Sequence, residues 1–446
     1  MASLVQTLTA SGGPESPGFL NDLVKQLWPN MAVAIADSIK QTVEPMFDAM
    51  LPAPLNTLHF VKVDLGHVPI HLENVDVHST ENGGIKLDMD VLWDGACDIE
   101  LDGKLTPKIG VEHLKLYGRL SILLCPLTSV LPCVGALQVA FINKPTIKMT
   151  YTDAASIASL GIIDSALRRT VTNIIASMAV LPNRFLVKLD AANDWFRTYQ
   201  HPLGVLRLTV ESGADLGEDV GAETNILKKL VHDVPDCFAT VTLSAAEPGW
   251  RTRTVRNSRH PEWRQTHDFL VADHDQAVEL DVKDRDMACH DDIGVAATSV
   301  RRLLLAGGRQ ELPLTHAGAP TGGRVTVSAR FYRFVPDLAS LSSSSSPSPS
   351  PSPSVPAPEE GGHDGQEAQK EEDRPIVGLL SVLVAGARGL RGRREQLRPS
   401  DETGAVEVPL DEVLRAPDLR LEKVFDLGSG VKLSAAVWLR GVRLAE

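Results

Sequence analysis

The stretch from Gly84 to Tyr151 decides the fold, and it opens with GIKLDMDVLW at residues 84–93. Apolar residues alternate there with lysine and aspartate, and the same period of two returns in LKLYGRLSIL (114–123), ALQVAF (136–141) and TIKMTY (146–151). Successive segments with this period predict long antiparallel strands that have one apolar and one solvated face. Such a sheet has a large apolar area, which either protein or a ligand must cover.

The composition limits the class of protein. With 446 residues, of which 43% are hydrophobic, the chain can bury at least two cores, so we expect two or three domains. The net charge of -13 argues against nucleic-acid binding, which needs a basic surface. The five cysteines show no CxxC spacing, and we interpret them as reduced thiols on the cytosolic side, without a metal site.

Two segments bear on targeting. Residues 1–18 form a small and polar leader without an apolar run, so we expect no signal peptide. The segment Leu120–Ile142 contains no charged residue and is long enough to suggest a membrane span. Because Pro126 and Pro132 interrupt it, we predict a strand, a turn and a second strand instead.

Helical spacing of apolar residues predicts two amphipathic helices that flank the strands. The first runs from Phe19 to Met50, and Pro29 and Pro45 are each expected to end or kink it. The second runs from about Ala154 to Met178. The sequence therefore predicts an α+β domain with long helices on a twisted antiparallel sheet.

The pattern changes in the second half of the chain. From Leu203 to about Val335, short strands separated by polar turns predict an all-β sandwich. Residues 336–374 are rich in serine and proline and then acidic, which predicts an extended linker. Strand-like sequence resumes at Ile376.

Short motifs in the first half resemble a known family. They are FLN (19–21), QLWP (26–29), LPAPL (51–55), VDLG (63–66), VGA (134–136), KP (144–145) and VLPNR (180–184). Over about Glu15–Asp190 the chain resembles the synaptotagmin-like mitochondrial-lipid-binding (SMP) domain. With a C2 domain after it, the architecture is similar to that of extended synaptotagmins, yeast tricalbins and plant synaptotagmins.

The resemblance implies a TULIP-type fold whose apolar groove holds glycerophospholipid acyl chains, and a homodimer formed end to end through the SMP domain. It divides the chain into a polar leader (1–18), an SMP domain (19–190), a C2 sandwich (203–335), a linker (336–374) and a truncated or degenerate C2-like segment (375–446). In the last segment the middle strands and the acidic loops of a C2 domain are missing, so we assign it no calcium.

The alternating residues are the candidates for lipid contact, and ordinary core packing is the alternative for each of them. They are Ile85, Leu87, Met89, Val91, Leu116, Leu120, Ile122, Val139, Phe141 and Met149 in the strands, with Ile163, Leu167 and Ile174 in the second helix.

Acidic residues in the second domain resemble the calcium loops of a C2 domain. Calcium takes six to eight oxygen ligands, so converging carboxylates suit it. The resemblance implies Asp284, Asp286, Asp291 and Asp236 as ligands, with Asp215 or Asp219 as a fifth and Asp292 as an alternative to Asp291. Gly217 to Pro235 interrupts the first of these loops as an insertion. The alternative is a solvated acidic loop that binds no calcium.

A basic run in the same domain resembles the family's phosphoinositide-binding patch. We expect Arg251, Arg253 and Arg256 to alternate along one strand, where they bind phosphoinositide or form a solubilising face. Bound calcium would neutralise the acidic loops and permit docking on anionic membrane lipids.

These features predict a lipid-transfer protein at contact sites between endoplasmic reticulum and plasma membrane, on the cytosolic face. The alternative is a calcium-responsive tether or scaffold without transfer activity. We expect no enzyme, because there is no Gly-x-Ser-x-Gly motif. The resemblance also implies an N-terminal hydrophobic anchor, and we expect this sequence to begin after it.

Overall fold

The computed structural model describes residues 17–51, 53, 55–80, 83–104, 106–152, 160–190, 198, 200–217, 234–244, 249–285, 290–335, 378–388, 406–427 and 431–444. The chain forms two compact units, one built mostly of residues up to Asn193 and the other mostly of residues from Asp194 onward. Among the described helices, none is long and apolar enough to cross a bilayer.

The first unit contains a seven-stranded antiparallel sheet, which confirms the predicted fold class. Its strands are β1 (His59–Asp64), β2 (His71–Ser79), β3 (Ile85–Gly103), β4 (Thr106–Leu124), β5 (Ala136–Phe141), β6 (Thr146–Tyr151) and β7 (Phe185–Lys188). The order is β1-β3-β4-β5-β7, with β2 paired to β3 and β6 paired to β4. The uncharged segment Leu120–Ile142 is the end of β4, a loop and β5, as its prolines predict.

A bulge between β3 and β4 shifts the apolar alternation. Ala96 pairs with His113 and Ile99 pairs with Val111, so two residues of β3 lie opposite a single residue of β4. An extra residue of this kind changes which side chains face the core. In β4 the core face is therefore odd-numbered up to Val111 and even-numbered from Leu114 onward.

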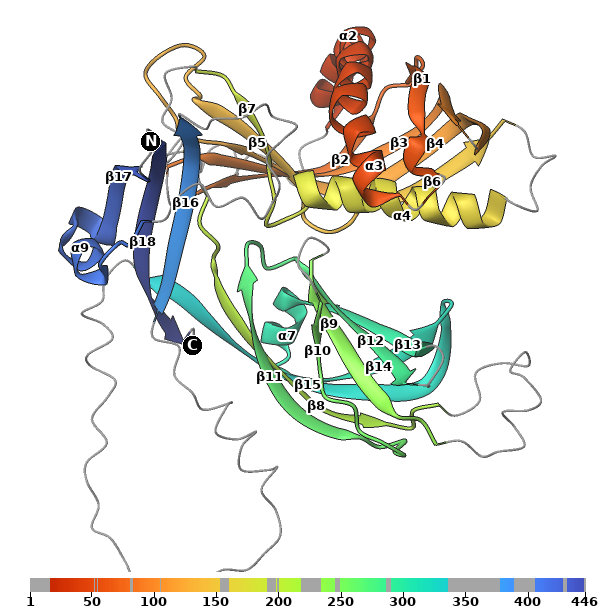
Figure 1. Cartoon of the computed structure of the whole chain (residues 1–446), viewed down its shortest axis with the longest axis vertical. Coiled ribbons are helices and arrows are strands. Elements are labelled where there is room, and N and C mark those ends of the chain that lie inside the picture. Colours follow the sequence, from red (N-terminus) through yellow and green to blue (C-terminus); the bar gives the residue numbers. More distant parts are fainter. Residues whose placement is uncertain are drawn as a thin grey trace, which may run out of the picture. The chain divides into compact units, whose positions relative to one another are not determined.

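Helices cover one face of this sheet (Figure 1). They are α2 (Gly18–Thr42), α3 (Glu44–Met50) and α4 (Leu160–Ala179). Pro45 lies in the first turn of α3 and separates it from α2, as expected, but α2 continues through Pro29. The burial of Trp28, Ala32 and Ala36 along one face of α2 offsets the backbone hydrogen bond that Pro29 cannot donate. Residues 153–159, where the second helix was expected to begin, lie outside the described residues.

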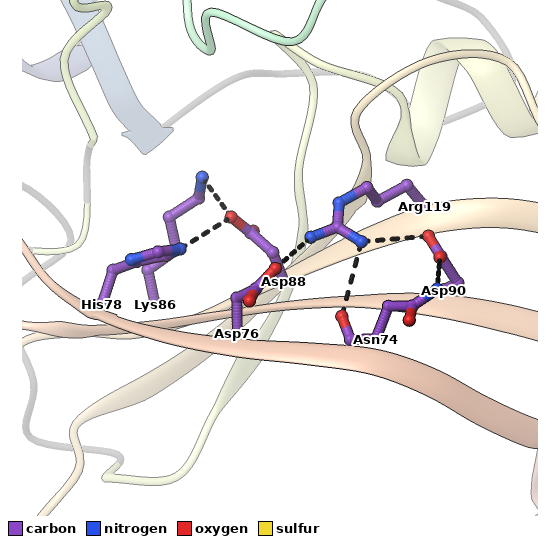
Figure 2. Close-up of polar contacts among 7 residues, drawn as sticks. All are labelled: Asn74, Asp76, His78, Lys86, Asp88, Asp90 and Arg119. Carbon is purple, nitrogen blue, oxygen red and sulfur yellow. Dashed lines mark hydrogen bonds and ion pairs between the residues drawn. The ribbon is translucent and has the colours of Figure 1, made fainter. Parts of the chain in front are cut away.

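The opposite face of the sheet is held by ion pairs (Figure 2). Arg119 reaches Asp90 at 3.1 Å and Asp76 at 2.5 Å, and Asn74 donates to Asp90 at 2.7 Å. Burial lowers the pKa of Arg119, but its hydrogen bonds to Asp90 and Asp76 outweigh that effect and raise it overall. Because these charged groups need water or each other, they fix the apolar side chains on the helix-covered face.

The second unit begins with the predicted sandwich. One layer contains β11 (Glu262–Val271), β8 (Gly204–Ala214), β15 (Ala319–Val335) and β14 (Arg309–His316). The other contains β10 (Trp250–Arg251), β9 (Cys237–Leu243), β12 (Ala277–Arg285) and β13 (His290–Ser299), and the short helix α7 (Val300–Leu305) follows β13. Leu206, Leu208, Val241, Leu280 and Val327 are fully buried in this unit, as expected for the inner faces of two packed layers.

The C-terminal segment also forms strands. They are β16 (Gly378–Arg388), β17 (Arg420–Asp426) and β18 (Lys432–Leu444). The helix α9 (Leu410–Arg415) and the 3-10 helix η4 (Pro417–Leu419) precede β17. β18 pairs with both β16 and β17, and its end pairs with β15 from Tyr332 to Val335. The segment therefore extends the sheet of the sandwich.

Candidate functional site

A cavity lies under the helices of the first unit. Its volume is about 390 Å³, which falls in the range of small-molecule sites. Every side chain that lines it is aliphatic or aromatic. The three helices, with Val43 between α2 and α3, contribute Trp28, Ile35, Ile39, Val43, Phe47, Leu167, Val171, Ile174 and Ile175. An uncharged site of this kind offers nothing to a polar ligand and suits hydrocarbon.

Two tryptophans contribute rings to the cavity and direct their polar atoms elsewhere. The indole nitrogen of Trp28 donates to the carbonyl of Gly66 at 3.1 Å, and that of Trp93 donates to the carbonyl of Val68 at 2.9 Å. The two ring centroids lie 5.8 Å apart. Since both N–H groups are paired with backbone, the rings present apolar surface without leaving a buried donor unsatisfied.

Seven of the thirteen candidate residues line this cavity. They are Val91, Leu116, Leu120, Phe141, Met149, Leu167 and Ile174. Met89, Leu87 and Ile122 instead belong to a neighbouring apolar cluster formed with Leu72, Val75 and Val91. Ile163 lies in α4, but its side chain is outside the described part of the chain.

The remaining candidates continue the same face of the sheet beyond the cavity. Ile85 pairs with Leu124, and Val139 pairs with Ile122. These four side chains are partly exposed. The apolar face is therefore longer than the part that α2, α3 and α4 cover.

Sequence reasoning missed most of the lining that comes from the first helix and from beyond the bulge. Trp28, Ile39 and Phe47 were recognisable as an apolar helical stripe, but a stripe alone does not show what it faces. Ile99 and Leu101 continue the odd-numbered alternation of β3 beyond the residues that were predicted, whereas Val111 lies on the other side of the shift in β4, where alternation traced back from Leu114 no longer holds.

Two of the predicted calcium ligands lie together in the second unit. The backbone N–H of Asp236 donates to Oδ1 of Asp284 at 2.8 Å, and Oδ1 of Asp236 accepts from the N–H of Asn257 at 2.9 Å. Burial, and then the negative charges of Asp284 and Asp236, raise the pKa of the Cys237 thiol to about 12. A concentration of negative charge at this point is suited to a cation.

The other acidic candidates have different surroundings. Asp215 pairs with Arg324 at 2.7 Å, and Asp292 pairs with Lys283 at 3.2 Å. Asp286, Asp219 and the side chain of Asp291 lie outside the described residues. Within the part of the chain that the structure describes, no group of three or more histidine, cysteine, aspartate or glutamate side chains is arranged to hold a metal ion.

The first and last residues of the expected insertion, Gly217 and Pro235, lie next to each other. A Cβ atom on Gly217 would lie 3.3 Å from Cγ of Pro235, so the residues that bracket the insertion are neighbours. Asp215 precedes the insertion and Asp236 follows it. The carboxylate of Asp215 is paired with Arg324, so calcium would have to compete with that ion pair for it.

The three predicted arginines were expected to alternate along one strand, and the structure shows that they do not. β10 ends at Arg251, and Thr252, the residue between the first two arginines, is buried. Arg251, Arg253 and Arg256 are all exposed. The guanidinium of Arg251 lies over the ring of Phe238 at 3.5 Å, a cation–π contact. Arg253 donates to the carbonyl of Glu262 at 3.4 Å.

Comparison with known proteins identifies two domains. The family of the synaptotagmin-like mitochondrial-lipid-binding domain matches residues 14–190, and the C2 domain matches residues 204–314. Extended synaptotagmin-1 of Mus musculus is 29% identical over 298 residues, which are 66% of this chain and 27% of that protein. Extended synaptotagmin-2 of Mus musculus is 29% identical over 287 residues, which are 63% of this chain and 33% of that protein.

The matched parts thus amount to a third or less of these relatives' own length. A solved structure of the SMP, C2A and C2B domains of extended synaptotagmin 2 covers 97% of this chain and is covered completely by it, with a TM-score of 0.62 and 20% identity. This likeness shows that the fold is the same.

Proposed function

We propose that this chain, whose two domains match the SMP and C2 families and which is similar to extended synaptotagmins, carries glycerophospholipids between membranes at contact sites. The observation that supports this most is the cavity of about 390 Å³ with an entirely apolar lining. Exposing an acyl chain to water costs roughly 0.8 kcal/mol per methylene, so a two-chain lipid faces a barrier on the order of 20 kcal/mol. A sheltered path through such a cavity removes most of that barrier.

The chemistry required of this chain is only binding. Trp28, Phe47 and Leu116 surround acyl carbon, and the polar headgroup stays near solvent. No bond is made or broken, so no nucleophile or base is needed. In this proposal the driving force for lipid uptake is the lower free energy of an acyl chain in the apolar cavity than in water.

Filling the cavity tests the proposal. Leu116→Trp and Leu120→Trp place bulk inside it, whereas Tyr117→Trp changes the adjacent residue of β4, which is 53% exposed. Wild type and Tyr117→Trp are expected to retain phospholipid in native mass spectrometry and to transfer labelled lipid between liposomes. The cavity variants are expected to lose at least about 90% of the bound lipid, because added bulk displaces the acyl chain.

A lipid-free wild-type protein would contradict the transfer proposal. If it still clustered liposomes, the alternative of a calcium-responsive tether without transfer would replace it. Circular dichroism of each variant shows whether a loss of lipid comes from a loss of folding.

Calcium and membrane docking form the second part of the proposal. Asp236 and Asp284 would hold calcium together with Asp286 and Asp291, and the bound ion would supply positive charge that offsets these carboxylates. Arg251, Arg253 and Arg256 are exposed, and we propose that they bind phosphoinositide headgroups on the same membrane. We also propose a homodimer through the SMP domain and a location at contacts between endoplasmic reticulum and plasma membrane.

A further inference from the structure

The loop between β4 and β5, residues 125–135, exposes three large apolar side chains. Leu127 is 47% exposed, Val130 is 61% exposed and Leu131 is 87% exposed. The segment Leu120–Ile142 that contains the loop has no charged residue. Exposing such a group of apolar side chains to water is unfavourable, and a patch of this kind is typical of a surface that binds a membrane or another molecule.

The backbone of this loop is paired within the loop itself. Thr128 donates from its backbone N–H to the carbonyl of Cys133 at 2.9 Å, and Cys133 donates to the carbonyl of Val130 at 2.6 Å. Gly135 donates to the carbonyl of Pro126 at 2.8 Å. Pro126 and Pro132 have no N–H to satisfy. The loop can therefore enter a medium of low dielectric constant with few unpaired backbone groups.

The loop also lies at the end of the apolar face that lines the cavity. Phe185 of β7 pairs with Val139 of β5, which pairs with Ile122 of β4, so the three side chains share one face. Along β7, Phe185 is 41% exposed and Val187 is 37% exposed. The next residue but one, Leu189, donates from its backbone N–H to the carbonyl of Gly135 in the loop at 3.0 Å.

Figure 1 shows that β5 and β7 extend past the helices that cover the rest of this sheet. The exposed strip on β4, β5 and β7 thus connects the covered cavity, through Leu120 and Phe141, with the loop.

We propose that residues 126–134 insert into the surface of a lipid bilayer and so bring the open end of this apolar strip against the acyl region. The passage of lipid along the strip rests on the proposed function, whereas the insertion of the loop does not depend on it. A second copy of the chain is the less suitable occupant. A stable protein interface needs about 20–30 residues on each side, whereas the loop presents three exposed apolar side chains.

Cys133 provides a probe inside the loop. It is exposed, whereas Cys97, Cys125 and Cys237 are buried, so an environment-sensitive fluorophore attached to the full chain with Cys289→Ser reports on the loop. Vesicles of phosphatidylcholine and phosphatidylserine are expected to shift its emission to the blue, more strongly with calcium than with a chelator. A nitroxide-labelled phospholipid in the same vesicles is expected to quench it.

Two variants test the role of the apolar side chains. Val130→Asp with Leu131→Asp is expected to abolish the blue shift and to weaken vesicle binding by about tenfold or more, because each change puts a charge where an apolar side chain would enter the bilayer. Leu305→Asp is the matched control, since Leu305 is 81% exposed but lies on α7, and it is expected to leave the blue shift unchanged.

The absence of a blue shift with vesicles in both conditions would overturn the proposal. So would a blue shift that appears without vesicles and increases with protein concentration, because a second copy would then cover the loop. If the loop inserts but native mass spectrometry finds no bound lipid, insertion stands and the lipid-transfer function fails.

Discussion

His201 is an imidazole held between an indole and two arginines. Its ring meets that of Trp438 edge to face, with 5.3 Å between centroids. Burial, and then the positive charges of Arg440 and Arg420, lower the pKa of His201 from 6.5 to about 4. The side chain is therefore neutral in the folded protein at neutral pH, where a positive charge would be repelled by both arginines.

The folded protein should lose stability through His201 on acidification. The unfolded chain takes up a proton near pH 6.5 and the folded chain only near pH 4, so the free energy of unfolding falls between these values, by on the order of 1–2 kcal/mol once solvent screening of this partly exposed group is included. Urea denaturation at several pH values would measure the effect. His201→Gln should remove this part of the pH dependence, whereas His71→Gln, at a side chain 58% exposed, should retain it. Equal slopes for His201→Gln and wild type would contradict the assignment.

At the scale of elements, β4 determines how the cavity is shaped. Its core face contains Gly118 between Leu116 and Leu120, and Gly118 pairs with Val91 of β3. A Cβ atom on Gly118 would lie 2.9 Å from Cδ1 of Phe141. The absence of a side chain at Gly118 thus lets the Phe141 ring lie across the strand and close one side of the cavity.

Gly118→Val should displace Phe141 and disturb the cavity. We expect it to lower the free energy of unfolding by about 1–3 kcal/mol, because an inserted side chain forces its neighbours off their preferred positions. We also expect less bound lipid in native mass spectrometry. Tyr117→Val, at the next residue and on the exposed face, is the control for a change of strand propensity. A Gly118→Val protein as stable as wild type would show that Phe141 moves without cost.

At the scale of the whole molecule, charge opposes the proposed membrane partner. The net charge is -13, and Asp236 and Asp284 add local negative charge in the C2 domain. An anionic membrane repels such a surface at distances up to the Debye length, about 8 Å at physiological ionic strength. Calcium bound at the acidic loops would reverse the sign of that interaction locally.

Binding to anionic vesicles should therefore require calcium and weaken in high salt. Sedimentation with phosphatidylserine vesicles is expected to show at least about tenfold more bound protein with calcium than with a chelator. Asp236→Asn with Asp284→Asn should lose this increase, whereas Glu279→Gln, at an exposed residue of the same strand as Asp284, should keep it. Equal binding in chelator would show that calcium does not control docking.

The sequence by itself determined the elements whose signal is local. The period of two in GIKLDMDVLW specifies a strand with one apolar face, and the apolar stripe from Phe19 to Met50 specifies helix, because each pattern repeats within a few residues of the chain. The strands of the sandwich and the family motifs are local in the same sense. These signals were enough to predict the fold class and seven of the 24 residues that line the cavity.

Only the tertiary structure decided how far the apolar face is covered. Leu120 and Ile122 have the same local pattern and both pack against the neighbouring cluster, yet of these two only Leu120 also lines the cavity. The pairing of Asp215 with Arg324 likewise joins residues that are 109 positions apart. Periodicity reports which side of an element is apolar, but where helices end over a sheet and which charges meet depend on contacts between distant segments, and no short pattern contains these.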